Sequence, residues 1–211
     1  MLSVAEILNR ILFPKFCLIC NKNGCLLCAT CESRLKLNTT TLPNWIISKY
    51  QYKDDNVRHL LFKLKYGHTA ELGFELGKYS YNFLKEKLEL ADYILIPVPI
   101  SKQRERERGY NQAALIAEGI ASSSENIKAI GCLTRTKHTN KLFKTENIDQ
   151  RKNEIQNSFT INPELLGNIQ NQKILIIDDI TTTGVTLYEI KNLLIKNGVE
   201  ENNIKAYTVA H

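Results

Sequence analysis

The sequence predicts an α/β fold, a parallel sheet flanked by helices, and two observations carry this prediction. Apolar runs at 93–98, 175–177 and 204–210 are typical of strands that are buried on both faces. Segments with the apolar spacing of helices alternate with these runs, as they do in parallel α/β sheets. With 211 residues and 43% hydrophobic content, the chain exceeds the usual single-domain size of about 100 to 150 residues. We therefore expect a main domain with an appendage.

The N-terminal segment, residues 1–16, reads as a short amphipathic helix that stops at Pro14. Glu6 and Arg10 lie inside its apolar pattern, which argues against a signal peptide. No apolar run in the sequence approaches the roughly 20 residues that span a bilayer. We expect a cytoplasmic protein with no membrane insertion. The apolar face of the helix would consist of Val4, Ile7, Leu8, Ile11 and Leu12.

Five of the six cysteines lie within fifteen residues, CLICNKNGCLLCATC, and Cys132 lies far away. Pairs of Cys-x2-Cys are typical of structural zinc sites, in which four thiolates surround the ion and stabilise a segment too small for its own core. Cys25 also forms such a pair with Cys28, so other quartets remain open, as do redox-active or free thiols. Because a predicted helix begins at the last pair, we expect the ligands to be Cys17, Cys20, Cys28 and Cys31.

The middle of the chain carries fewer signals. Residues 45–52 read as a strand and residues 56–67 as a helix that is rich in apolar and basic side chains. A second helix follows at 70–88. Gly73 and Gly77 are expected to weaken it, because glycine is a poor helix former.

A basic segment follows the predicted strand at 93–98. Pro97 and Pro99 end that strand, and we expect a loop that leads through Gly109 into a helix beginning near Asn111. The alternation of arginine and glutamate in KQRERER is equally typical of a solvated helix face whose charges cancel. The cations of this segment are Lys102, Arg104, Arg106 and Arg108.

Two adjacent carboxylates, Asp178 and Asp179, follow the strand at 175–177. Open α/β sheets bind ligands at the carboxyl ends of their strands, so we expect both side chains at that edge. A threonine- and glycine-rich loop comes next and leads into a predicted helix at 185–197. Hydroxyl and backbone N–H donors at a helix N-terminus suit a phosphate anion. The sequence therefore predicts a phosphate site beside two carboxylates, with donors from Thr182, Thr183, Gly184 and Thr186.

The string ILIIDDITTTGVTL closely resembles the phosphoribosyl pyrophosphate (PRPP) signature of type I phosphoribosyltransferases. The resemblance implies that Asp178 and Asp179 hold the ribose 2′- and 3′-hydroxyls and that the loop holds the 5′-phosphate. It also implies that Mg²⁺ binds with PRPP. Thr182 replaces an aspartate that is usual in the purine-salvage branch, which argues against that branch. The implied loop residues are Thr181, Thr182, Thr183, Gly184, Val185 and Thr186.

Across nearly the full chain, the order of motifs resembles the ComF family of competence-associated, phosphoribosyltransferase-like proteins. The motifs are the cysteine knuckle, KLKYG, PVPISKQRERERGYNQA, LTR with a basic connector, and IIDDITTTGVT. The resemblance implies a type I phosphoribosyltransferase-like core at 91–211 with a flexible hood at about 135–158. An N-terminal helix and zinc-binding knuckle at 1–44 and a helical linking segment at 45–90 would precede the core. The implied pyrophosphate-side or partner-binding residues are Arg104, Arg108, Asn111 and Gln112.

Two functions remain open from the sequence. The first is a Mg²⁺-dependent phosphoribosyltransferase of unknown acceptor that is associated with DNA uptake. The second is a catalytically silent PRPP-binding accessory protein that contacts single-stranded DNA, or competence and DNA-processing proteins. A net charge of +6 suits phosphate-rich partners in both cases. For DNA we expect contacts from residues 102–108 and from Lys137, Lys141 and Lys144 of the hood.

Overall fold

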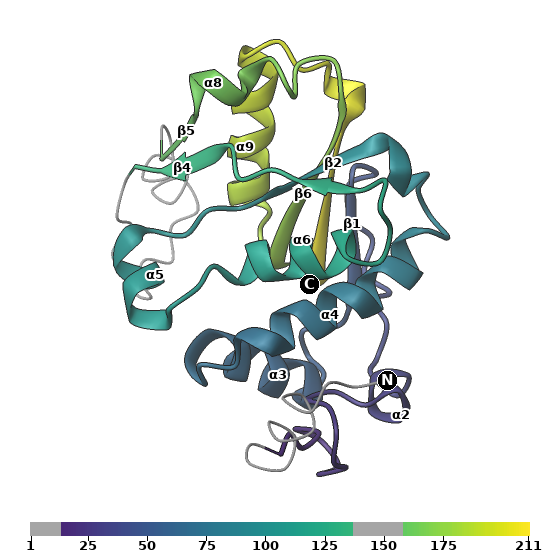
Figure 1. Ribbon diagram of the computed structural model, residues 1–211. Helices are drawn as coiled ribbons and strands as arrows, with labels where there is room; N and C mark the ends of the chain where they lie inside the picture. The colour runs from purple at the N-terminus through teal and green to yellow at the C-terminus, as the bar shows by residue number, and fades with distance from the viewer. Residues whose placement is uncertain (1–13, 137–157) are drawn as a thin grey trace.

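The computed structural model describes residues 14–136 and 158–211, whose arrangement Figure 1 shows. Five strands form one parallel sheet in the order β1-β7-β6-β2-β3, which confirms the predicted sheet. The predicted N-terminal helix and all but the ends of the predicted hood lie outside the described residues. The strands are β1 (Ile46–Tyr50), β2 (Tyr93–Pro97), β3 (Lys128–Ala129), β6 (Lys173–Ile180) and β7 (Ile204–Ala210).

Helices cover both faces of this sheet (Figure 1). They are α3 (Asp55–Tyr66), α4 (Ala70–Leu84), α6 (Gln112–Ala121) and α9 (Val185–Lys196). Leu175 and Ile177 of β6 belong to a core that includes residues of α3, α4 and α6, whereas Ile174 and Ile176 belong to a second core that includes residues of α9. All four side chains are fully buried. The strand is apolar on both sides because both of its faces are covered.

Glycines allow α4 and α6 to approach each other closely. A Cβ atom on Gly77 would lie 2.3 Å from the carbonyl oxygen of Ile116, and one on Gly119 would lie 2.2 Å from that of Phe74. A larger residue at either position would therefore push the two helices apart. Gly77 was expected to weaken its helix, but the helix spans 15 residues because this contact offsets the low helix propensity of glycine.

The cysteine-rich segment docks on α4 and β1 through polar contacts as well as apolar ones. It contains the short helix α2 (Ala29–Glu32), whose Glu32 accepts a hydrogen bond from the buried Lys49 Nζ at 2.7 Å. The Tyr79 hydroxyl of α4 donates to the carbonyl oxygen of Leu27 at 3.0 Å. Cys17, Leu27, Cys28, Cys31 and Leu35 are buried in the same core as α3, α4 and α6. The segment is thus packed against the sheet domain.

A two-stranded antiparallel sheet, β4 (Leu133–Arg135) with β5 (Phe159–Ile161), borders residues 137–157. Strand β5 belongs to this small sheet and not to the main one. None of the helices in the described ranges is long and apolar enough to cross a membrane. The remaining elements are α5 (Lys102–Arg108), α8 (Pro163–Leu166), η1 (Leu90–Asp92) and η2 (Glu201–Asn203).

Candidate functional site

The two carboxylates lie near the carboxyl end of β6, at the expected edge of the sheet. The sequence predicted that they follow the strand, but they are part of it, because β6 continues to Ile180. Pairing with β7 sets Asp178 opposite Thr208 and Ile180 opposite Ala210, which overrides the low strand propensity of aspartate. The Asp178 carboxylate accepts a hydrogen bond from the backbone N–H of Asp179 at 2.8 Å. This bond fixes the first carboxylate.

The second carboxylate has a cation beside it. Lys65 Nζ of α3 lies 2.8 Å from Asp179 Oδ2, and both side chains are mostly buried, with 23% and 9% exposed. The contact is a charge pair without the alignment of a hydrogen bond, so among the described residues this buried oxygen has no hydrogen-bond donor. Burial, and then the neighbouring charge of Asp179, raise the pKa of Asp178 well above its usual range. Two such carboxylates favour a ligand that brings hydrogen-bond donors and positive charge.

The loop after β6 presents a helix N-terminus at the same edge. Thr181 is buried and its backbone N–H donates to the carbonyl oxygen of Ala210 at 3.1 Å, while Thr182 and Thr183 are exposed. Gly184 adopts a left-handed conformation, with φ of 73°, as the N-cap of α9. Glycine is favoured there because L side chains clash at positive φ. Val185 and Thr186 form the first turn, so their backbone N–H groups have no acceptor within the helix.

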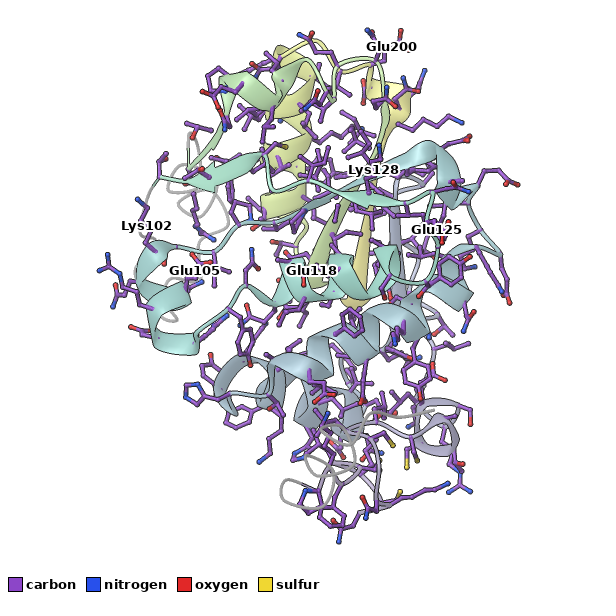
Figure 2. All side chains as sticks on the ribbon, in the orientation of Figure 1. Lys102, Glu105, Glu118, Glu125, Lys128 and Glu200 are labelled. Carbon is purple, nitrogen blue, oxygen red and sulfur yellow. The ribbon has the colours of Figure 1, made fainter. Side chains whose placement is uncertain are left out.

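The basic segment after β2 is a helix, so the predicted loop was wrong, and the helix of the alternative prediction is present. Helix α5 begins after Ser101, whose hydroxyl accepts from the backbone N–H of Arg104, and ends at Gly109 with φ of 83°. None of its residues is buried. Figure 2 shows Lys102 and Glu105 on the surface of this helix. Serine and glycine at the two ends stop α5 after seven residues.

Asn111 and Gln112 fix the junction between α5 and α6. Asn111 caps α6 by accepting from the backbone N–H of Ala113 at 3.0 Å, and its amide donates to the carbonyl oxygen of Val98 at 3.0 Å. Gln112 is buried and its oxygen accepts from Arg108 Nη1 at 2.8 Å. Within the described ranges, its buried Nε2 has no acceptor. The N–H donors of this amide are therefore unused among the described residues.

Sequence reasoning missed two charged residues of this region. Lys65 lies in the KLKYG motif, to which we had given no role, and Arg135 ends β4 at the start of the predicted hood. Burial, and then the charge of Arg104, lower the pKa of Arg135, whereas Glu189 and Asp178 raise it. Arg104 and Arg135 therefore act on the same region as the acid pair. The KLKYG match was the only signal for Lys65, and it did not show which residue the lysine contacts.

The four cysteines expected as metal ligands form one cluster. The sulfur atoms of Cys17, Cys20, Cys28 and Cys31 all lie within 4.8 Å of one another, and Cys25 is not among them. Tetrahedral zinc with Zn–S bonds of about 2.3 Å needs sulfur atoms roughly 3.8 Å apart, so the cluster fits zinc. Burial raises the pKa of Cys17, but backbone N–H donors from Cys20, Cys28 and Ile19 outweigh it and bring the pKa to about 6. Backbone donors thus favour a thiolate here.

Comparisons with known proteins agree with this geometry. A family model described as "Phosphoribosyl transferase domain" matches residues 121–211, which include β6, the loop and α9. Competence protein ComFC of Bacillus subtilis is 31% identical over 177 residues, which cover 81% of this chain and 67% of that protein. Competence protein F of Haemophilus influenzae is 35% identical over 115 residues, covering 54% of this chain and 49% of that protein.

A third relative has a different name. DNA utilization protein YhgH of Shigella flexneri is 32% identical over 145 residues, covering 66% of this chain and 61% of that protein. The matches thus span about half to two thirds of the length of these relatives. This chain belongs to the ComF family and has a phosphoribosyltransferase-like core.

Proposed function

We propose that this chain binds PRPP with Mg²⁺ at the carboxyl edge of its sheet and serves DNA uptake. The supporting observation is that β6 carries two carboxylates and then leads, through a left-handed glycine, into the N-terminus of α9. Carboxylates suit the ribose hydroxyls, and exposed backbone N–H groups suit the 5′-phosphate. The names of the relatives, which refer to competence and DNA utilization, support the biological role.

In the catalytic form of this proposal, the 5-phosphoribosyl group passes from PRPP to an unidentified acceptor. The bond from C1′ to pyrophosphate breaks, a bond to the acceptor forms on the opposite face, and the acceptor loses a proton. Positive charge grows on the ribose and negative charge on the leaving group, so the catalysis is mainly electrostatic. Asp178 and Asp179 would orient the ribose, and Arg104, Arg108 and Gln112 would face the pyrophosphate. Mg²⁺ supplies charge neutralisation and needs few protein ligands, because it binds mainly substrate oxygens and water.

Calorimetry with PRPP is the direct test. We expect binding of one PRPP per chain in the presence of Mg²⁺, and weaker binding when a chelator removes the ion, since Mg²⁺ neutralises part of the pyrophosphate charge. Release of pyrophosphate, measured with a panel of nucleobases and amines as acceptors, separates a catalyst from a silent binder. The absence of PRPP binding with Mg²⁺ present would contradict the proposal.

We further propose one structural zinc at Cys17, Cys20, Cys28 and Cys31. A closed quartet of cysteines leaves no open coordination position for a substrate, which is typical of a structural site. Among the described residues no cysteine forms a disulfide, as is usual in a reducing compartment, so we propose that the protein acts in the cytoplasm.

A second candidate function is an accessory protein that binds PRPP and single-stranded DNA without catalysis. One observation favours it: α5 presents four cations, and none of its residues is buried. Contacts with phosphates release counterions from the strand. Glutamates within α5 offset part of its charge, so we expect binding to be weak and to depend on salt. Besides PRPP and DNA, this accessory protein would bind proteins that take up or process DNA.

Binding to labelled oligonucleotides over a range of salt concentrations tests this second function. We expect the logarithm of affinity to fall with the logarithm of salt concentration by about 0.7 per phosphate neutralised. Charge reversal of Arg104 and Arg106 should reduce the slope. A matched control variant reverses the charges of Lys128 and Lys196, so its net charge changes by the same amount. Lys128 pairs near the amino end of β2, and Lys196 ends α9. Equal slopes in the two double variants would rule out α5 as the DNA contact.

A further inference from the structure

We infer that the last turn of α3 forms a third wall of the PRPP site and that Lys65 is a positioning residue for its acid pair. The inference rests on the proposed PRPP binding. Neither the acid motif nor the family model, which begins at residue 121, includes α3. The helix lies beside α4 in Figure 1.

Three consecutive residues of this turn contact three different parts of the site. The carbonyl oxygen of Leu64 accepts from the hydroxyl of Tyr110, just before α6, at 2.8 Å. Lys65 Nζ lies 2.8 Å from Asp179 Oδ2 on β6. The guanidinium of Arg108, at the end of α5, lies 5.5 Å from the centre of the Tyr66 ring. The turn thus joins the acid strand to the segment assigned to pyrophosphate.

Burial strengthens the ion pair between Lys65 and Asp179. Surface ion pairs contribute little because water screens them, but the Asp179 side chain is only 9% exposed. Without a cation, the charge of Asp179 would raise the pKa of Asp178 further, because Lys65 acts in the opposite direction. Lys65 thus offsets part of the negative charge of the pair and holds the Asp179 carboxylate in place, and a charged carboxylate is a strong acceptor for a ribose hydroxyl. The ammonium has further N–H donors for anionic oxygens of the ligand.

Other charged groups also act on the pair. Lys65 lowers the pKa of Asp178, and Arg135 of β4 interacts with Asp178, while Arg104 of α5 and Glu189 of α9 interact with Arg135. His211, which follows β7, has its Nδ1 3.1 Å from the carbonyl oxygen of Thr181. Lys65 contacts the Asp179 carboxylate directly, so its removal should change the protonation of Asp178.

The test compares Lys65→Met, Lys65→Arg and Lys63→Met in the full zinc-loaded chain. Calorimetry with PRPP and Mg²⁺ should show that Lys65→Met lowers affinity roughly tenfold or more at neutral pH, because a shift of one pKa unit changes protonation tenfold. Loss of the cation removes a charge that lowers the pKa of Asp178, so as pH falls the variant should lose binding at a higher pH than the wild type. Lys65→Arg should restore affinity and pH profile, since it restores the charge. Lys63→Met makes the same charge change in the same motif and should stay within about twofold of wild type.

Several outcomes would overturn the inference. Unchanged affinity and pH profile in Lys65→Met would show that the ion pair is dispensable, and equal losses in Lys65→Met and Lys65→Arg without a shift in pH would show a purely structural role. If Lys65→Met does not fold, as judged by circular dichroism, Lys65→Gln replaces it with the same expectations. A wild-type chain that does not bind PRPP would instead overturn the proposed function, and NMR titration of the carboxyl groups without ligand would still decide whether Lys65 lowers the pKa of Asp178.

Discussion

Replacing Cys17 by serine is expected to remove zinc from the chain and to unfold the cysteine-rich segment. A structural zinc ion contributes about 10–16 kcal/mol to the folding of small zinc-dependent peptides, and residues 14–44 are too few to form a core of their own. The same result is expected for serine at Cys20, Cys28 or Cys31. Metal analysis of the purified variants measures zinc per chain directly.

Cys25→Ser is the matched control, because Cys25 lies in the same loop and its sulfur is outside the cluster of four. We expect this variant to keep one zinc per chain. Loss of zinc from Cys25→Ser alone, or full zinc in Cys17→Ser, would show that a different quartet binds the metal.

The loss of zinc should also destabilise the sheet domain. Glu32 follows the ligand Cys31 and accepts from Lys49 Nζ, so an unfolded segment would leave the buried cation of β1 without its carboxylate. Glu75 of α4 would lose its hydrogen bonds from the backbone N–H groups of Leu26 and Leu27. Removing one partner of a buried ion pair typically costs about 3–5 kcal/mol. Urea denaturation should therefore show a lower midpoint for the whole chain.

Much of the fold could be predicted from the sequence because local patterns determine it. Strand β7 spans 204–210 as expected, since an apolar run with β-branched residues fits only a buried strand there. The predicted helix at 185–197 is α9, which ends one residue earlier, at Lys196. Helix α5 was misassigned although Ser101 and Gly109 mark its ends. The preceding prolines had favoured a loop, whereas the charge alternation was equally typical of a helix face, and the two caps determine the local structure.

The remaining features depend on contacts between residues far apart in the sequence. From the sequence, Gly77 is expected to weaken its helix. The structure shows that it leaves room for the backbone of α6 at Ile116. Lys65 looks like any basic residue on an amphipathic helix, and its contact with Asp179 arises because α3 packs at the carboxyl edge of the sheet. A single sequence contains no information on which helix packs against which strand. The acid pair could be predicted, whereas its counter-ion could not.

Replacing both Asp178 and Asp179 by alanine is expected to weaken PRPP binding by several kcal/mol. Hydrogen bonds from a ligand to charged groups contribute about 1.5–3 kcal/mol each, and both carboxylates would be lost. Calorimetry with Mg²⁺ present measures the change. Asp92→Ala is the control, because Asp92 pairs with Lys173 at the amino end of β6. Wild-type affinity in the double variant would exclude the acid pair as the ribose site.

The single variant Asp178→Asn separates binding from stability. The folded-state pKa of Asp178 is raised by burial and by Asp179, so the folded chain binds a proton that the unfolded chain releases above about pH 4. Asp178 therefore lowers the free energy of unfolding, and this reduction grows as pH rises from about 4 toward the folded-state pKa of Asp178. Its ionised form is destabilising at neutral pH. Asparagine removes this cost, so urea denaturation at neutral pH should show a more stable protein whose PRPP affinity is lower. A less stable Asp178→Asn variant would show that the carboxylate serves the fold, whereas a gain in stability with a loss of binding is expected of a charge retained for its ligand.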